Sequence, residues 1–144
     1  MKVVIDNNIV IDALKPNPEY ETDARHVFLL IWHEKISPYL CANSLTDIFY
    51  ILQKVQGAKK AKDSITNLIM VNNIIPLTEN DCIDAIALPM DDFEDSIIAV
   101  CAQKINADYI VSRDKKFLNA KTCVEVITPK QLLAKTNWHP ATHV

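Results

Sequence analysis

The sequence has 144 residues, of which 49% are hydrophobic and 23% are charged, so it suits one globular domain with a single core and excludes a disordered chain. The formal net charge of −3 gives no sign of the basic face that nucleic-acid binders usually carry, unless several acids hold metal ions. The single glycine, Gly57, excludes a Walker loop or a dinucleotide fingerprint, and no apolar run approaches the roughly 18 residues that cross a bilayer.

Short β-rich runs alternate with helical patterns along the chain, and the first run starts at the N-terminus without a small-residue cleavage site, so we expect a cytoplasmic protein with no membrane association. The expected strands are residues 2–5, 36–41, 74–77, 109–112 and 124–127. The expected helices are residues 21–34, 44–55, 58–71, a segment ending near residue 88, 96–105 and 129–135. This order predicts one α/β domain over residues 1–136, with a mostly parallel sheet covered by helices on both faces. The tail, residues 137–144, is expected to be loosely held.

Cysteine and histidine spacing gives no zinc site, because no pair of these residues has ligand spacing. The cysteines are Cys41, Cys82, Cys101 and Cys123. We expect buried, inert thiols, since a free cysteine packs as a small hydrophobe. The basic stretch "QKVQGAKKAKDS" is expected to be a solvated helix end.

Like charges are crowded in the stretch "DDFED", just before an apolar run. One explanation is helix capping, because an acid three residues after Ser, Thr or Asp marks a helix start, as in Asp92 with Asp95. The same spacing, with Asp or Gln as the third residue, recurs at Ser44 with Asp47, Thr78 with Asp81 and Thr128 with Gln131. Capping therefore explains Asp92, Asp95 and Asp47 without any ligand. The other explanation is a shared cation.

Two further acids favour the cation. Asp6 and Asp114 each follow a predicted strand, and ligands bind at the carboxyl edge of open parallel sheets. Helices that follow strands also begin at that edge, which would bring Asp47 and Asp95 to the same place. Converging carboxylates raise one another's pKa, and hard, oxygen-seeking Mg²⁺ or Mn²⁺ would relieve the repulsion.

Three segments carry a specific resemblance: "VVIDNNIVIDAL", "ANSLTDIFYIL" and "DFEDSIIAVCAQKINADYIVSRDKKF". Together they resemble the motifs of PIN-domain ribonucleases, most of all the toxin-like branch (VapC type) that carries a D-F-E-D stretch. The resemblance extends over about residues 2–128. It implies a single-domain PIN-like fold and four acids that bind metal and act in catalysis, namely Asp6, Asp47, Asp95 and Asp114.

The individual matches imply supporting roles for neighbouring residues. Asn8 matches the third residue of the family's D-T-N motif, and Ser112 stands for Thr in its T-x-D motif. Both are expected to orient a carboxylate or a water. Asp92 is expected to cap the helix that bears Asp95 or to support the metal indirectly. Arg113 has two open interpretations, a contact to a substrate phosphate or an ordinary surface position.

The activity implied is metal-dependent hydrolysis of RNA, with one or two Mg²⁺ or Mn²⁺ ions that make a bound water more acidic and stabilise charge on the phosphate. One departure from the family is Asp47, where Glu is usual. It leaves open a non-catalytic RNA-binding or interaction module with the same fold. A flap-type DNA nuclease and a phosphoacceptor receiver are weaker alternatives.

The resemblance also implies partners. Proteins of this branch usually pair with a small antitoxin and form homodimers through helices of the N-terminal half. Phe28, Trp32 and Tyr50 are apolar enough for such an interface, although core packing would explain them equally well.

Overall fold

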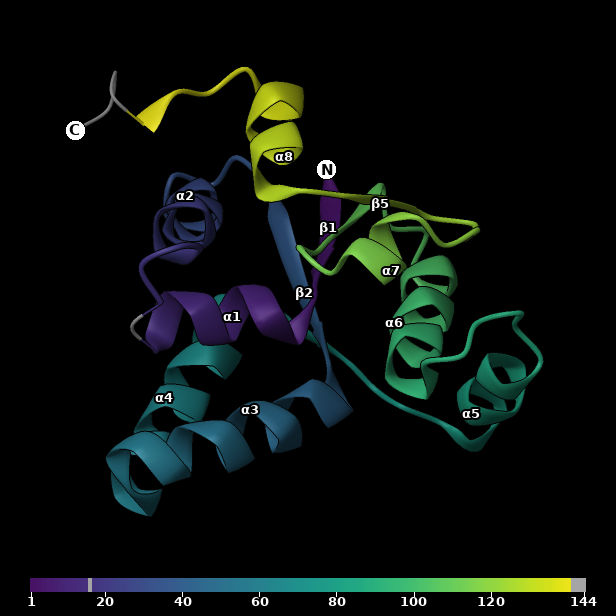
Figure 1. Ribbon diagram of the computed structural model, residues 1–144, viewed down its shortest axis with the longest axis horizontal. Helices are drawn as coiled ribbons and strands as arrows, with labels where there is room; N and C mark the ends of the chain where they lie inside the picture. Colours follow the sequence, from purple (N-terminus) through teal and green to yellow (C-terminus); the bar gives the residue numbers. More distant parts are fainter. Residues whose placement is uncertain (16, 141–144) are drawn as a thin grey trace.

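The computed structural model describes residues 1–15 and 17–140 and contains a central five-stranded sheet (Figure 1). The strands are β1 (Lys2–Ile5), β2 (Ser37–Cys41), β3 (Asn73–Ile75), β4 (Tyr109–Val111) and β5 (Glu125–Ile127). Their order is β3-β2-β1-β4-β5, and every neighbouring pair is parallel. The predicted α/β class with a parallel sheet is confirmed, and the carboxyl ends of all the strands lie at one edge.

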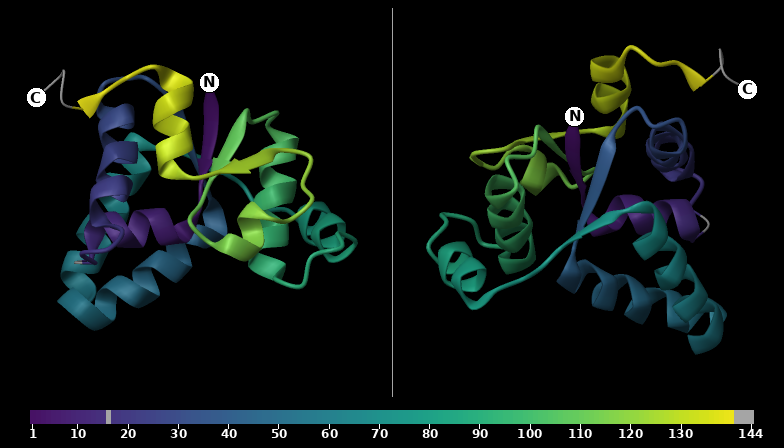
Figure 2. Two further views of the ribbon diagram at one scale, coloured as in Figure 1. Left: turned by 45° about the horizontal axis from the view of Figure 1, so that its top comes forward. Right: turned by 180° about the vertical axis from the view of Figure 1, so that it is seen from behind.

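Helices cover both faces of this sheet. They are α1 (Asn7–Leu14), α2 (Glu21–Trp32), α3 (Ala42–Gln56), α4 (Ala58–Val71), α5 (Glu79–Ile86), α6 (Phe93–Lys104), α7 (Lys115–Leu118) and α8 (Pro129–Thr136). Alternate residues of a strand point to opposite faces, so Val3 and Ile5 join the core under α1 to α4 and α8, whereas Val4 joins the core under α5, α6 and α7. Figure 2 shows the two groups of helices on opposite sides of the strands. No helix among the described residues is long and apolar enough to cross a membrane.

Helix α6 is buried on nearly all sides, with every residue from Asp95 to Ala102 buried. Its apolar run "SIIAVCA" packs between the sheet and α5. A helix that is apolar all round belongs inside a protein. The crowded acids at its start are therefore held on one of the best-packed elements of the fold.

Two of the predicted capping pairs form reciprocal boxes. Thr78 Oγ1 accepts a hydrogen bond from the Asp81 backbone N–H, and the Asp81 carboxylate accepts one from the Thr78 N–H. Thr128 and Gln131 do the same. The prediction for Ser44 and Asp47 is wrong, because α3 already begins at Ala42, directly after β2, and has no side-chain cap. Capping therefore does not explain Asp47.

The remaining differences from the expectations concern short or isolated elements. Helices α1 and α7 were not expected, because the first is short and begins with two asparagines and the second is a single turn. Trp138 is only 4% exposed and packs beside His33, so the tail is not loose at this residue. The rest of that expectation, residues 141–144, lies outside the described residues. Cys41 and Cys101 are buried, but Cys123 is exposed.

Candidate active site

The four acids singled out in the sequence meet in one pocket at the carboxyl edge of the sheet. Asp6 directly follows β1, Asp114 lies three positions after the last residue of β4, and Asp47 and Asp95 lie in the early turns of α3 and α6. The pocket has a volume of about 360 Å³. Its lining residues come from the three helices α1, α3 and α6 and from the residues just before α1, α6 and α7: Asp6, Asn7, Asn8, Ile11, Asp47, Ile51, Asp92, Glu94, Asp95, Ile98 and Asp114.

Asp6 is the most tightly held of the acids. Its carboxylate accepts hydrogen bonds from the Asn7 backbone N–H at 2.8 Å, the Ser112 hydroxyl at 2.7 Å and the Asn8 amide at 3.2 Å. Asp6 is 6% exposed, and this burial raises its pKa, although the bonds from Ser112 and Asn7 act against the rise. Asn8 and Ser112 thus orient the Asp6 carboxylate.

Asp114 is connected to the same network through Ser112. Its backbone N–H donates to Ser112 Oγ at 3.1 Å, and its carboxylate accepts from the Lys116 N–H at 3.0 Å as the N-cap of α7. One hydroxyl therefore ties the turn after β4 to the end of β1. This arrangement sets two pocket carboxylates relative to each other.

Asp92 and Asp95 have different positions at the start of α6. Asp92 caps the helix, accepting the Asp95 backbone N–H at 3.1 Å, and its own side chain also lines the pocket. Asp95 is 7% exposed. Burial, followed by the charges of Asp6, Asp92 and Asp114, raises its pKa to about 7. The cap holds Asp95 in the pocket even though its charge is unfavourable there.

Glu94 also lines the pocket, although no role was predicted for it. It reaches Asp47 across the pocket, and that contact, together with burial, raises the pKa of Glu94 to about 7. Asp47 also accepts a hydrogen bond from the Asn7 amide at 3.3 Å. The sequence signal that could have revealed this contact is Asp47, which is shorter than the usual Glu. Glu94 on α6 has the longer side chain and reaches Asp47 on α3.

Asp12 and Arg113 form a second feature that the sequence did not reveal. Asp12 is 2% exposed, and Arg113 donates to both of its carboxylate oxygens, at 2.5 and 3.2 Å. The guanidinium carbon of Arg113 also lies 3.8 Å from the centre of the Tyr20 ring. Arg113 is therefore not an ordinary surface residue, because its ion pair links α1 to the turn that carries Ser112 and Asp114. Its contact to a substrate phosphate stays a prediction.

The donor set fits a hard divalent cation. It consists of carboxylate and amide oxygens, which are the ligands that Mg²⁺ and Mn²⁺ prefer. The side-chain oxygens of Asn7 and Asn8 are buried and lack a hydrogen-bond partner, which is costly unless a ligand or water reaches them. Within residues 1–15 and 17–140, no three His, Cys, Asp or Glu side chains are already placed so that together they could hold a metal ion. The pocket carboxylates would therefore have to move closer together to bind a cation, whose charge would offset their mutual repulsion.

Comparisons with known proteins agree with this geometry. A curated relative, Ribonuclease VapC1 of Aquifex aeolicus, is 27% identical over 144 residues, covering 94% of this chain and 96% of that protein. Among solved structures, VapC20 of Mycobacterium tuberculosis, a toxin that cleaves the sarcin–ricin loop, has a TM-score of 0.68 at 12% identity and covers 83% of this chain and 95% of that one. VapBC2 of Rickettsia felis, bound to a promoter DNA fragment, has a TM-score of 0.65 at 15% identity, with 89% and 98% covered. The family model described as PIN domain matches residues 2–116, so the chain belongs to the PIN domain family.

Proposed function

We propose that this protein is a metal-dependent endoribonuclease that hydrolyses RNA phosphodiester bonds and acts as the toxin of a toxin–antitoxin pair. The observation that carries the proposal is the meeting of Asp6, Asp47, Asp95 and Asp114 in one pocket of a PIN domain chain. The ribonuclease and toxin relatives support the same chemistry. A non-catalytic module is less well supported, because Glu94 lies beside the shortened Asp47.

The pocket residues have distinct roles in this mechanism. Asp6, Asp95 and Asp114 would hold one or two Mg²⁺ or Mn²⁺ ions, with Asp47 and Glu94 completing the far side. A divalent ion supplies an acidified attacking water and stabilises the charge that develops on the phosphate. Ser112 and Asn8 keep the Asp6 carboxylate oriented, and Asp92 keeps Asp95 at the first turn of α6. In the metal-free pocket the contact with Asp47 raises the pKa of Glu94 to about 7, and a cation bound beside this pair would favour the ionised form.

The deciding experiment is RNA cleavage by the purified protein, freed of any antitoxin, with Mg²⁺, with Mn²⁺ and with EDTA. We expect cleavage with either metal and none with EDTA, because uncompensated carboxylates repel the phosphate. End-labelled structured RNAs resolved on gels would report internal cuts. Cleavage that persists in EDTA would contradict metal dependence, and no cleavage of transfer, ribosomal or messenger RNA with either metal would contradict the nuclease.

Metal removal should also change how stability depends on pH. Because the pKa values of Asp95 and Glu94 are raised to about 7, ionising them costs more in the folded protein than in the unfolded chain. Their contribution to the free energy of unfolding of metal-free protein is therefore expected to fall as pH rises from about 4 to about 7, and then to level off. Added Mg²⁺ should raise the melting temperature more at alkaline than at acidic pH.

Melting curves with EDTA and with Mg²⁺ over this pH range would measure the effect. The Asp95→Asn variant is the control, since the difference between it and wild type isolates one carboxyl group. If the difference in melting temperature between the two proteins does not change with pH, ionising Asp95 is not unfavourable in the metal-free pocket.

Partners follow by analogy with the similar structures, several of which are toxin–antitoxin complexes. We propose a small antitoxin, a homodimer and a cytoplasmic location for this chain. Trp32 is 79% exposed and Tyr50 is 56% exposed, so core packing does not explain them, whereas Phe28 is partly buried against the core. Trp32 and Tyr50 therefore stay candidates for an interface.

A further inference from the structure

A second groove adjoins the acid pocket, since the two share Asp92 and Asp95. The charged residues that line the groove besides these two are Asp91, Lys116 and Lys121. Lys116 lies in α7, two residues after Asp114, and Lys121 lies in the segment that follows α7. Both lysines are exposed. In the part of the chain that the structure describes, neither ammonium group has an ion-pair partner.

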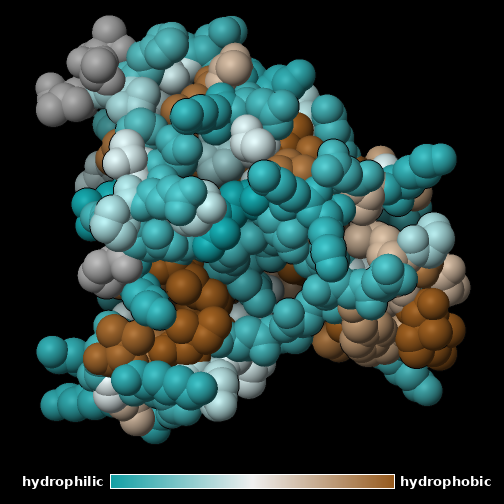
Figure 3. Space-filling view, in the orientation of Figure 1, coloured by the Kyte–Doolittle hydropathy of each residue, from teal (hydrophilic) through white to brown (hydrophobic). Residues whose placement is uncertain are grey.

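The other sides of the acid pocket offer no cation. No lysine or arginine lines the pocket itself, and the nearest arginine, Arg113, is held by Asp12. The wall formed by α1 and α3 carries Ile11 and Ile51. Figure 3 shows hydrophobic side chains gathered where α1 and α3 lie, and hydrophilic ones over the region of α7. Among the described residues that line the acid pocket or the adjoining groove, positive charge is therefore carried by Lys116 and Lys121, on the α7 side.

We propose that Lys116 and Lys121 bind backbone phosphates of the RNA strand next to the phosphate that is cut. The inference rests on the proposed function and adds the path of the substrate to it. Lysine is a compact charge that binds phosphate oxygens without reading the base. Each contact offsets part of the repulsion between the strand and the acid pocket, which the net charge of −3 does not relieve.

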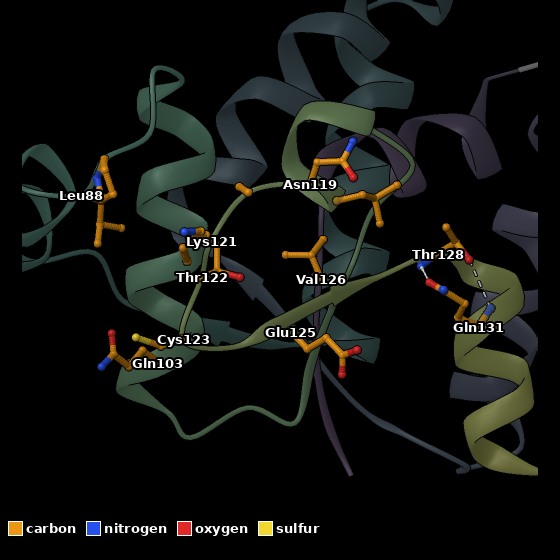
Figure 4. Close-up of a pocket in the computed structure, with 14 residues that line it drawn as sticks. Leu88, Gln103, Asn119, Lys121, Thr122, Cys123, Glu125, Val126, Thr128 and Gln131 are labelled. Carbon is orange, nitrogen blue, oxygen red and sulfur yellow. Dashed lines mark hydrogen bonds between the residues drawn. The ribbon is translucent and has the colours of Figure 1, made fainter.

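The strand has room to continue beyond Lys121. This lysine also lines a wider hollow of about 930 Å³, whose other polar residues include Gln103, Asn119 and Thr122. Figure 4 shows these side chains around the hollow between α6 and β5. Gln103 lies near the end of α6 and Asp95 near its start, a separation of about 12 Å along the helix axis at ~1.5 Å per residue. The groove and the hollow share Pro89, Ala120 and Lys121, so they adjoin each other, and a strand bound at Lys121 can continue into the hollow.

The test compares two matched double variants. Lys116→Ala with Lys121→Ala removes the groove charges, and Lys59→Ala with Lys60→Ala removes two exposed charges at the start of α4. The substitution keeps the hydrogen bond that the backbone N–H of residue 116 donates to Asp114, the N-cap of α7. Cleavage of a single-stranded RNA is measured with Mg²⁺ at several salt concentrations. We expect the groove variant to raise KM roughly tenfold and to leave kcat nearly unchanged, with no effect in the α4 variant.

The salt dependence adds a second readout. Each lost phosphate contact on a single strand should reduce the slope of log affinity against log salt by about 0.7, so the groove variant should lose about 1.4. Lys116→Arg with Lys121→Arg should restore both values. An unchanged KM and salt slope would overturn the inference, and so would a loss of kcat at constant KM, because the lysines would then act in the chemistry.

Failure of the inference and failure of the proposed function can be told apart. Binding of a fluorescent RNA oligonucleotide, measured in the Asp95→Asn background, does not require cleavage. If wild type cuts no RNA but the groove substitutions still weaken this binding and its salt slope, the lysine path stands and the nuclease does not. If wild type cuts RNA and binding is unaffected by the groove substitutions, the nuclease stands and the path does not.

Discussion

The Asp95→Asn variant is expected to lose metal-dependent RNA cleavage by at least about a hundredfold, because it removes one metal-binding charge at almost constant shape. The protein should still fold, since the backbone N–H of residue 95 keeps its bond to Asp92. Without metal, the variant should even be slightly more stable above neutral pH, as one of the repelling carboxylates is gone. Cleavage rates and thermal unfolding of the two proteins, prepared in parallel, would measure both effects.

Asp92→Asn is the matched control for this experiment. It makes the same chemical change three residues earlier, and Asn is as good an N-cap as Asp, so α6 should be preserved. We expect a modest loss of rate. Equal inactivity of the two variants would place Asp92 among the metal ligands, and undiminished cleavage by Asp95→Asn would remove Asp95 from the site.

The largest effect on stability is expected from Arg113→Gln. It leaves the Asp12 carboxylate, which is 2% exposed, without its charged partner. Breaking a buried ion pair from one side costs roughly 3–5 kcal/mol, and a value of about 3 kcal/mol is expected here because the guanidinium is 34% exposed. Urea unfolding would measure the loss of free energy.

A double variant shows whether the loss of stability comes from the unpaired charge of Asp12. With Asp12→Asn added to Arg113→Gln, no unpaired charge remains, and Asn17 can still donate its amide to residue 12. The double variant should recover most of the stability that the single variant loses. A single variant that loses less than about 1 kcal/mol would mean that water or Asn17 already satisfies Asp12.

The sequence predicted the fold well where a pattern is long or repeated. The sheet and the longer helices follow from apolar periodicity, and the capping boxes at Thr78 and Thr128 were visible as local spacing. Helix α1 was missed because it has only eight residues and begins with two asparagines, which are poor helix formers. Trp138 was missed for a different reason, since its burial depends on packing against His33 from a distant part of the chain.

The sequence predicted that four acids would come together, but it did not predict the contacts that these acids and their neighbours make. Asp6 and Asp114 could be placed because the carboxyl ends of parallel strands share one edge. The bond between Arg113 and Asp12 joins residues that are 101 positions apart, and no local pattern announces it. Glu94 had the right charge and neighbourhood, but its reach to Asp47 depends on how α3 and α6 face each other. The basic stretch near Lys59 was conspicuous in sequence, whereas Lys116 and Lys121 gain significance only from the groove they share.

Three pocket residues, Asp6, Asp92 and Asp114, are also the N-caps of α1, α6 and α7. The same side chains that line the acid pocket therefore also cap the helices around it. A descendant that abandons catalysis is consequently not free to substitute these positions at random. Asparagine would keep the caps and discard the charge, whereas alanine would discard both and loosen the helices. Related proteins that have lost the activity but keep the domain are therefore expected to have asparagine at these three positions.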